Sequence, residues 1–136
     1  SLHDALPIFQ VGLKGKVTLK GRTNDVRKEL LGSSCLVMSS RFEGFPMILL
    51  EALATGLPIV SYDCPKGPSE IVTIGANGYL AKVGDTGTLA QGICSVIANE
   101  ELRKRFGAES KRRSENFSLE KTMEKWDALF KSALKR

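Results

Sequence analysis

The chain has 136 residues, of which 42% are hydrophobic, and its 20 lysines and arginines outnumber its 15 aspartates and glutamates to give a formal net charge of +5. This composition is typical of one ordinary folded domain. The longest apolar runs are about four residues, far short of the roughly 20 that a membrane-spanning helix needs, so no transmembrane segment is expected.

From Lys16 onward, short aliphatic or β-branched runs alternate with longer helical patterns, which is typical of a parallel α/β layer. The predicted strands are 16–20, 35–39, 58–62 and 79–83. The predicted helices between them are 25–31, 47–55 and 69–73. Three helices are predicted to follow, at 86–98, 101–113 and 118–134. The expected fold class is therefore α/β, with a parallel sheet and an all-helical C-terminal tail.

The beginning of the sequence departs from this pattern. The chain opens with Ser1 and its first methionine is Met38, so we expect a fragment of a longer protein. Residues 1–15 are interpreted as a processing scar or linker remnant. Residues 16–136 are expected to form one partial domain, which includes the C-terminal helices at 101–134.

Cysteine and histidine usage argues against disulfides and metals. The three cysteines, Cys35, Cys64 and Cys94, are an odd and widely spaced set, which favours a reducing, cytosolic compartment. The single histidine, His3, lies near a terminus, and no D-x-D pair occurs. Cysteine, histidine and paired aspartates are the usual metal ligands, and the sequence offers few candidates among them, so no metal is expected. No cofactor is expected either.

The most informative segment, residues 39–52, joins a predicted strand to a predicted helix through a glycine turn. Gly44 allows a ligand to approach the backbone closely, and the first free amides of the helix, at Phe45 and Met47, point outward. Pro46, a residue favoured at the first helical position, has no amide proton to offer. Such a helix start favours anions, especially phosphate.

Two acids flank this turn. Glu51 is the only charge in residues 46–54, so its helix is predicted to be largely buried, and a buried carboxylate needs hydrogen-bond donors such as a ribose diol. The alternative is that Glu51 only benefits from a helix start and that Glu43 is a solvated turn residue.

The spacing of Glu43 and Glu51, in S-R-x-E-G-F-P-x-x-x-x-E-A followed by A-x-G-L-P-I-V, resembles the E-x7-E signature of family 4 retaining glycosyltransferases. These enzymes have the two-domain GT-B fold. Further segments carry the resemblance to the end of the chain: D-C-P-K-G-P-S-E-I-V at 63–72, N-G-Y-L at 77–80 and F-S at 117–118. The resemblance implies the incomplete C-terminal half of a GT-B fold, a Rossmann-like domain that binds a nucleotide sugar. The C-P-K-G-P-S-E variant is similar to bacterial transferases that build cell-envelope glycans.

The resemblance also implies roles. Glu43 would be the catalytic residue beside the transferred sugar, and Glu51 would hold the ribose hydroxyls. The remaining implied donor-binding residues are Gly44, Phe45, Pro46 and Met47 near the sugar and diphosphate, Arg22 and Thr23 near the nucleobase, and Lys66 near the phosphates. For Lys66, a solvated loop lysine is the alternative. The family transfers a sugar with retention, and the leaving phosphate helps to deprotonate the acceptor, so no protein nucleophile is required.

Parts of the family pattern are missing. The Arg and Lys that neutralise the diphosphate in the family, and the acceptor-binding N-terminal domain, are not found before Lys16. The intact protein is therefore expected to be a hexosyl-type transferase, and this chain alone is predicted to be inactive. The partners that follow are a nucleotide sugar and a glycan or lipid-linked acceptor.

The C-terminal tail is basic, with 11 lysines and arginines against 7 acids in residues 100–136. This charge indicates either a solvated helix face or a peripheral contact with the inner face of the plasma membrane. Nucleic-acid binding is not expected, because only Phe106 lies between the two basic clusters. An apolar stripe in the last helix is expected to be core. The family resemblance implies that it packs on the missing N-terminal half, which would leave some of it exposed in this chain. Its members are Leu119, Met123, Trp126, Phe130 and Ala133.

Other function classes stay open at this stage. An epimerase or phosphorylase of the same fold would need its own catalytic groups. A non-catalytic α/β nucleotide-binding module would need none. Glycoside hydrolysis by the two carboxylates is disfavoured, because the phosphate-binding helix start would then have no role.

Overall fold

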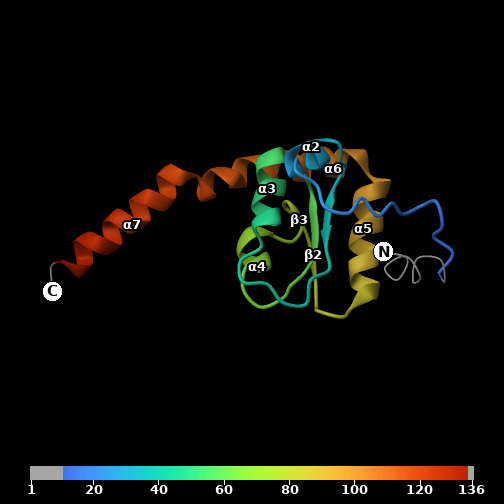
Figure 1. Ribbon diagram of the computed structural model, residues 1–136, viewed down its shortest axis with the longest axis horizontal. Helices are drawn as coiled ribbons and strands as arrows, with labels where there is room; N and C mark the ends of the chain where they lie inside the picture. Colours follow the sequence, from blue (N-terminus) through green and yellow to red (C-terminus); the bar gives the residue numbers. More distant parts are fainter. Residues whose placement is uncertain (1–10, 135–136) are drawn as a thin grey trace.

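The computed structural model describes residues 11–134, in which short parallel strands alternate with helices (Figure 1). The strands are β1 (Leu36–Met38), β2 (Ile59–Tyr62) and β3 (Gly78–Ala81). The helices are α2 (Val26–Leu31), α3 (Met47–Thr55), α4 (Pro68–Ile71), α5 (Thr86–Ala98), α6 (Glu100–Ser114), the 3-10 turn η1 (Glu115–Phe117) and α7 (Leu119–Ala133). The predicted helices 47–55 and 86–98 are confirmed residue for residue.

The three strands form one parallel sheet in the order β1-β2-β3. Val37 lies opposite Val60, and Val60 lies opposite Tyr79. The strands approach closely at Gly78, where an added Cβ atom would lie 1.9 Å from the carbonyl oxygen of Ile59. The parallel α/β sheet predicted from the sequence is therefore confirmed.

Helices cover both faces of this sheet, with α3 and α5 on opposite sides of the strands in Figure 1. Successive strand residues point to opposite faces, so Ile59 joins one buried cluster and Val60 another. The first cluster includes Leu30 of α2, Leu49 and Leu53 of α3, and Ile71 of α4. The second includes Leu89 and Val96 of α5 and Phe106 of α6. This two-sided layering is the Rossmann-like arrangement that the resemblance implied.

The predicted strand at 16–20 is wrong. These residues adopt no strand, and the amide of Lys16 instead donates to the carbonyl of Leu13 at 2.9 Å in a turn. Val17 and Leu19 are exposed by 43% and 54%. An aliphatic run forms a strand only when a neighbouring strand supplies hydrogen bonds, and none of the described strands pairs with this segment.

Helix α7 projects away from the rest of the molecule (Figure 1). None of its residues is buried, and Leu119, Met123, Trp126 and Phe130 are all exposed. The expected exposure of part of this stripe is therefore confirmed for the described residues. Its packing on a further domain stays a prediction, because helical periodicity identifies an apolar face without identifying what covers it. No helix within residues 11–134 is long and apolar enough to cross a membrane.

Candidate functional site

The loops that follow β1 and β2 meet at the carboxyl end of the sheet, where ligands bind in open α/β folds. The first loop, residues 39–46, leads into α3, and the second, residues 63–67, leads into α4. They touch where the backbone of Gly67 lies against the ring of Pro46, since an added Cβ atom on Gly67 would lie 2.2 Å from Cδ of Pro46. The structure therefore brings the loop of Glu43 and the loop of Lys66 together.

The first loop presents most of the candidate residues. Glu43 is half-buried, whereas Gly44, Phe45 and Met47 are exposed. Pro46 is buried and is the N-cap of α3, so the helix begins at Met47, as the sequence predicted. Pro46 itself stays outside the helix because its ψ of 86° is outside the helical region. The first amides of α3 have no carbonyl one turn earlier in the helix, so they are available to an anion.

The second loop has an unusual backbone. Lys66 has φ of +66° and is the only non-glycine residue with positive φ in the described part of the chain. Gly67 follows with φ of +114°. The side chain of Lys66 is exposed at the same edge of the sheet as the start of α3, which is compatible with the phosphate role implied by the resemblance.

Cys64, in the second loop, is buried, with 2% of its surface exposed. Burial raises the pKa of its thiol, and the carboxylates of Glu43 and Asp63 raise it further. The carboxylate of Glu43 and the thiol of Cys64 therefore interact electrostatically. The sequence offered no sign of it, because Cys64 and Glu43 belong to different loops and approach only through the pairing of β1 with β2.

Glu51 is exposed, so the expectation that it is buried is wrong. It lies on the outer face of α3, whereas the buried positions are Leu49, Ala52 and Leu53 on the face toward the sheet. Apolar neighbours in the sequence therefore did not mean burial for this position. In a solvated setting the carboxylate needs no fixed partner, so it is free to accept hydrogen bonds from a ligand.

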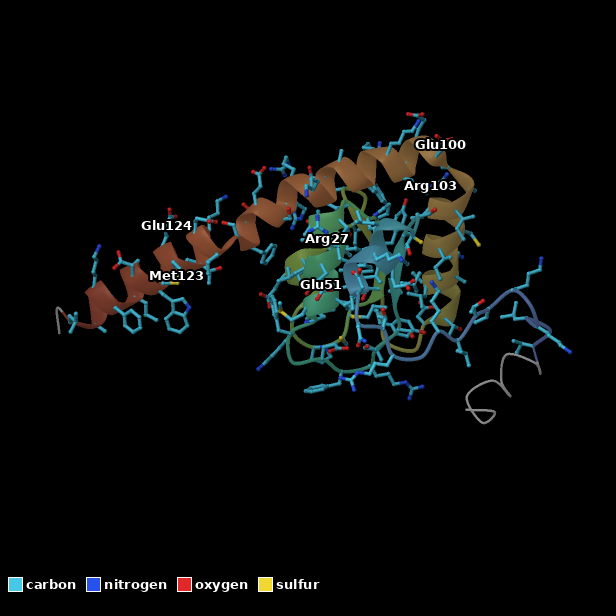
Figure 2. The ribbon with its side chains drawn as sticks, turned by 45° about the horizontal axis from the view of Figure 1, so that its top comes forward. Arg27, Glu51, Glu100, Arg103, Met123 and Glu124 are labelled. Carbon is cyan, nitrogen blue, oxygen red and sulfur yellow. The ribbon has the colours of Figure 1, made fainter. Side chains whose placement is uncertain are left out.

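Glu51 lines a cavity of about 540 Å³ between α2, the C-terminal half of α3, and α6. Arg27 lies across this cavity on α2, and Figure 2 shows the two residues on the same side of the molecule. The other lining residues are Leu30, Leu31, Ala54, Thr55, Gly56 and Lys111. Its volume falls within the range of small-molecule sites, and its walls combine apolar side chains with a few charges.

A second hollow of about 350 Å³ adjoins the first, and Glu51 lines both. Met47 and Leu50 form its α3 side, and Phe117 and Ser118 form the other. Because Met47 begins α3 and Glu51 lies one turn later, a continuous surface leads from the helix start to the larger cavity. The arrangement can hold an extended anionic ligand with a diol-bearing group beside Glu51.

Arg27 and Lys111 were missed by sequence reasoning. Lys111 belongs to a basic cluster, but its ammonium donates to the carbonyl of Ala54 at 2.7 Å across a separation of 57 residues. Arg27 belongs to no motif. Only the packing of α2 and α6 beside α3 reveals that these two cations flank Glu51.

Arg22 and Thr23 lie exposed in the segment before α2. The hydroxyl of Thr23 accepts a hydrogen bond from the amide of Asp25 at 3.1 Å, and Asp25 caps α2 by accepting from the amide of Lys28 at 2.9 Å. Neither Arg22 nor Thr23 lines the cavity of Glu51. Their contact with a nucleobase stays a prediction.

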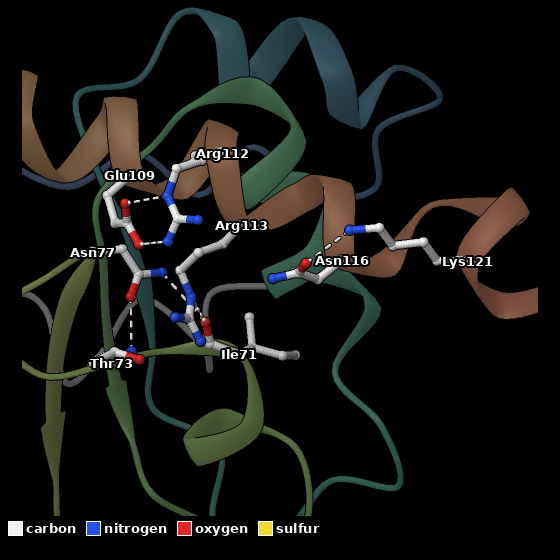
Figure 3. Close-up of polar contacts among 8 residues, drawn as sticks. All are labelled: Ile71, Thr73, Asn77, Glu109, Arg112, Arg113, Asn116 and Lys121. Carbon is white, nitrogen blue, oxygen red and sulfur yellow. Dashed lines mark hydrogen bonds and ion pairs between the residues drawn. The ribbon is translucent and has the colours of Figure 1, made fainter. Parts of the chain in front are cut away.

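Polar contacts from α6 fix the elements that carry the site (Figure 3). The carbonyl of Ile71, at the end of α4, accepts from Arg113 Nε and from Asn77 Nδ2, each at 3.3 Å. Asn77 Oδ1 also accepts from the amide of Thr73 at 2.7 Å. Arg103 donates to the carbonyls of Val96 and Ile97, at 3.0 and 2.5 Å. Part of the basic tail therefore serves to hold helix ends together.

Comparison with known proteins agrees with this geometry. The family model described as glycosyl transferases group 1 matches residues 6–113. The poly(glycerol-phosphate) alpha-glucosyltransferase of Bacillus subtilis (strain 168) is 33% identical over 114 residues, which cover 84% of this chain and 17% of that protein. The poly(ribitol-phosphate) alpha-N-acetylglucosaminyltransferase of Staphylococcus aureus (strain COL) is 32% identical over 121 residues, which cover 88% of this chain and 24% of that protein.

A solved structure gives the same result. A mutant of S. aureus TarM, in complex with fondaparinux, alpha-GlcNAc-glycerol and UDP, matches with a TM-score of 0.86 and 31% identity over 96% of this chain and 27% of that one. The chain spans between 14% and 38% of the length of the curated relatives that it matches. It belongs to the group 1 glycosyltransferases and has the Rossmann-like α/β fold of their C-terminal domain.

Proposed function

We propose that this chain is the donor-binding part of a retaining glycosyltransferase that transfers a hexosyl-type sugar from a UDP-sugar. The observation that carries the proposal is the continuous surface from the start of α3 to the cavity of Glu51. The presence of UDP in the TarM complex supports a uridine nucleotide. The names of the glucosyl- and N-acetylglucosaminyltransferase relatives support a role in bacterial cell-envelope polysaccharide synthesis.

In this proposal the donor lies along α3. The diphosphate accepts hydrogen bonds from the first amides of α3, around Met47, where the helix dipole favours negative charge. Lys66 adds a positive charge from the neighbouring loop. The ribose hydroxyls donate to Glu51 at the wall of the cavity of about 540 Å³.

The phosphate charge is proposed to be neutralised without a metal ion. Within residues 11–134, no group of three or more His, Cys, Asp or Glu side chains could hold one. The helix start and Lys66 supply the positive potential instead. No further cofactor is proposed, because a nucleotide sugar already carries its own leaving group.

Glu43 is proposed to act at the reacting sugar. It is half-buried one residue before the exposed Gly44, so its carboxylate can lie near a sugar that is held by the helix start. As the bond to the diphosphate breaks, positive charge develops at the anomeric carbon, and a nearby carboxylate stabilises it. The departing phosphate takes the acceptor proton on the same face, which preserves the configuration.

The acceptor is proposed to be a glycan or a lipid-linked sugar held by a further domain. Gly44, Phe45, Met47, Glu51 and Lys66 are exposed, and we propose that they hold the donor from one side only. Because much of the catalytic effect comes from holding both reactants in fixed geometry, we propose that this chain alone transfers no sugar. The proposed location is the cytoplasm, with a peripheral contact at the inner face of the plasma membrane.

Calorimetric titration of the chain with UDP tests the proposal. We expect a dissociation constant on the order of 1 mM for this one-sided site, and roughly tenfold weaker binding for Glu51→Gln, which loses charge-assisted hydrogen bonds. Glu124→Gln is the matched control, since Glu124 is an exposed helix glutamate on the distant α7 (Figure 2). Equal affinities in the two variants would contradict the proposal.

A further inference from the structure

Gly67 lies at a contact that no side chain could occupy. A Cβ atom added to Gly67 would lie 2.2 Å from Cδ and 2.9 Å from Cγ of Pro46. Both residues are buried. Since carbon atoms that are not bonded pack at about 3.5 to 4.0 Å, any residue larger than glycine must displace either the ring of Pro46 or the loop that carries residue 67.

The loop is held on its other side, so it resists displacement. The carbonyl of Gly67 accepts hydrogen bonds from the amides of Glu70 at 3.0 Å and Ile71 at 3.2 Å, which start α4. The far end of α4 is held by the Arg113 contact to the carbonyl of Ile71 (Figure 3). Displacement is therefore expected to fall on Pro46.

Pro46 in turn sets the start of α3. It caps the helix, and its carbonyl accepts from the amide of Leu49 at 2.9 Å. Met47 and Ile48 follow it directly, and their amides are the first of the helix. A shift of the Pro46 ring therefore moves the amides that are proposed to hold the donor diphosphate.

We propose that Gly67 is a positioning residue for donor binding: its bare backbone fixes the N-terminus of α3 through Pro46, and so sets the affinity for the nucleotide diphosphate. This inference rests on the function proposed above. According to this inference, the second loop positions the start of α3, and this role is separate from the positive charge that Lys66 provides.

The matched control is Gly84, in the loop between β3 and α5. Gly84 has φ of +88° and no atom within 4 Å of an added Cβ, whereas Gly67 has φ of +114° together with the contact to Pro46. Alanine is strained at positive φ at both positions. Only at position 67 does the alanine methyl group also clash with Pro46, at the start of α3.

The test compares Gly67→Ala and Gly84→Ala in the full chain by NMR amide spectra and by titration with UDP. Gly67→Ala is expected to shift the amides of Met47 and Ile48 before UDP is added, and to weaken UDP binding about tenfold, the scale expected for a misplaced binding group. Gly84→Ala is expected to do neither. Adding Pro46→Ala to Gly67→Ala removes the ring and is expected to return both readouts to those of Pro46→Ala alone.

Two results would overturn the inference. One is a Gly67→Ala protein that resembles Gly84→Ala in both readouts. The other is a double variant whose Met47 and Ile48 amide shifts match those of Gly67→Ala and differ from those of Pro46→Ala. If Gly67→Ala does not fold, Pro46→Ala alone removes the same contact, and unchanged UDP affinity in that variant overturns the inference. If the unaltered chain does not respond to UDP, the proposed function fails, and the amide shifts without nucleotide still decide whether Gly67 positions α3.

Discussion

Gly107 of α6 and Gly56 at the end of α3 meet backbone to backbone, so that a Cβ atom on Gly107 would lie 2.5 Å from the carbonyl oxygen of Gly56. This approach allows Ser110 to donate a buried hydrogen bond of 2.7 Å to the carbonyl of Leu57. It also brings Lys111 to the cavity of Glu51. The two glycines therefore determine how α6 closes one side of the candidate site.

Gly107→Ala is predicted to destabilise the protein by about 1 to 3 kcal/mol, as expected when extra volume is forced into a close-packed contact. Urea unfolding measures this change. Gly87→Ala is the control, because its added Cβ would meet nothing closer than Asp85 Oδ1 at 3.5 Å. That helical substitution is expected to leave stability unchanged or raise it by up to about 1 kcal/mol. Similar losses in the two variants would argue against the close contact.

Cys94 and Cys64 are predicted to react at different rates with N-ethylmaleimide at pH 8. Cys94 is exposed, whereas Cys64 is buried and its thiol pKa is raised by burial and by the nearby Glu43 and Asp63 carboxylates. A raised pKa leaves less of the reactive thiolate. Peptide mass spectrometry should find Cys94 modified first and Cys64 modified only after unfolding. Early labelling of Cys64 would show that its burial is wrong.

The same thiol gives the folded state a pH dependence. Its pKa is higher in the folded chain than in the unfolded chain, so the folded chain retains the proton longer as pH rises. The unfolding free energy should therefore fall as pH rises above the unfolded value of about 8.5. Urea unfolding at pH 7 and pH 9.5 measures this, and Cys64→Ala should reduce the dependence. If the unfolding free energy of Cys64→Ala falls between pH 7 and pH 9.5 as much as that of the unaltered chain, groups other than Cys64 cause the pH dependence.

Removal of α7 is predicted to leave the rest of the fold intact. No residue of α7 is buried, so a chain that ends at Ser118 should keep its unfolding free energy within about 1 kcal/mol. The truncated chain should also associate less, since it lacks the exposed Trp126 and Phe130. Phe106→Ala, by contrast, should cost about 3 to 5 kcal/mol, because Phe106 is fully buried. Loss of cooperative unfolding on truncation would contradict this account.

The two acids of the site are predicted to act differently in an intact transferase that contains this segment. Glu51→Gln should mainly weaken nucleotide binding, because Glu51 lines the nucleotide cavity. Glu43→Gln should lower kcat more than nucleotide affinity, since its proposed partner is the reacting sugar. Steady-state kinetics with nucleotide inhibition separates the two quantities. Identical changes in both variants would contradict the division of roles.

Local sequence signals predicted α3 well. The turn at Gly44, the fixed φ of Pro46 and the left-handed Gly56, with φ of +74°, define its ends by backbone chemistry alone. The strand at 16–20 and the burial of Glu51 were wrong for a shared reason. Strand formation and burial both depend on which other elements pack against the segment, and the apolar content of the segment does not determine this.

The contacts that complete the site are tertiary and could not be read from motifs. Arg27, Lys111 and Gly67 approach the α3 segment only after the sheet has placed α2, α6 and the second loop around it. A glycine in D-C-P-K-G-P-S-E indicates a turn, but it does not identify Pro46 as the neighbour that forbids a side chain. The family resemblance identified Glu43, Glu51 and the two loops as parts of the site. The contacts between them were found only in the structure.

The most direct test of the central claim is an NMR titration of the isotopically labelled chain with UDP. We predict that the amides of Phe45, Met47 and Glu51 shift together and saturate with one dissociation constant, because one ligand occupies the helix start and the adjoining cavity. Shifts confined to the basic helices α6 and α7, with α3 unchanged, would show ordinary charge attraction and would contradict the account of this surface as a nucleotide-sugar site.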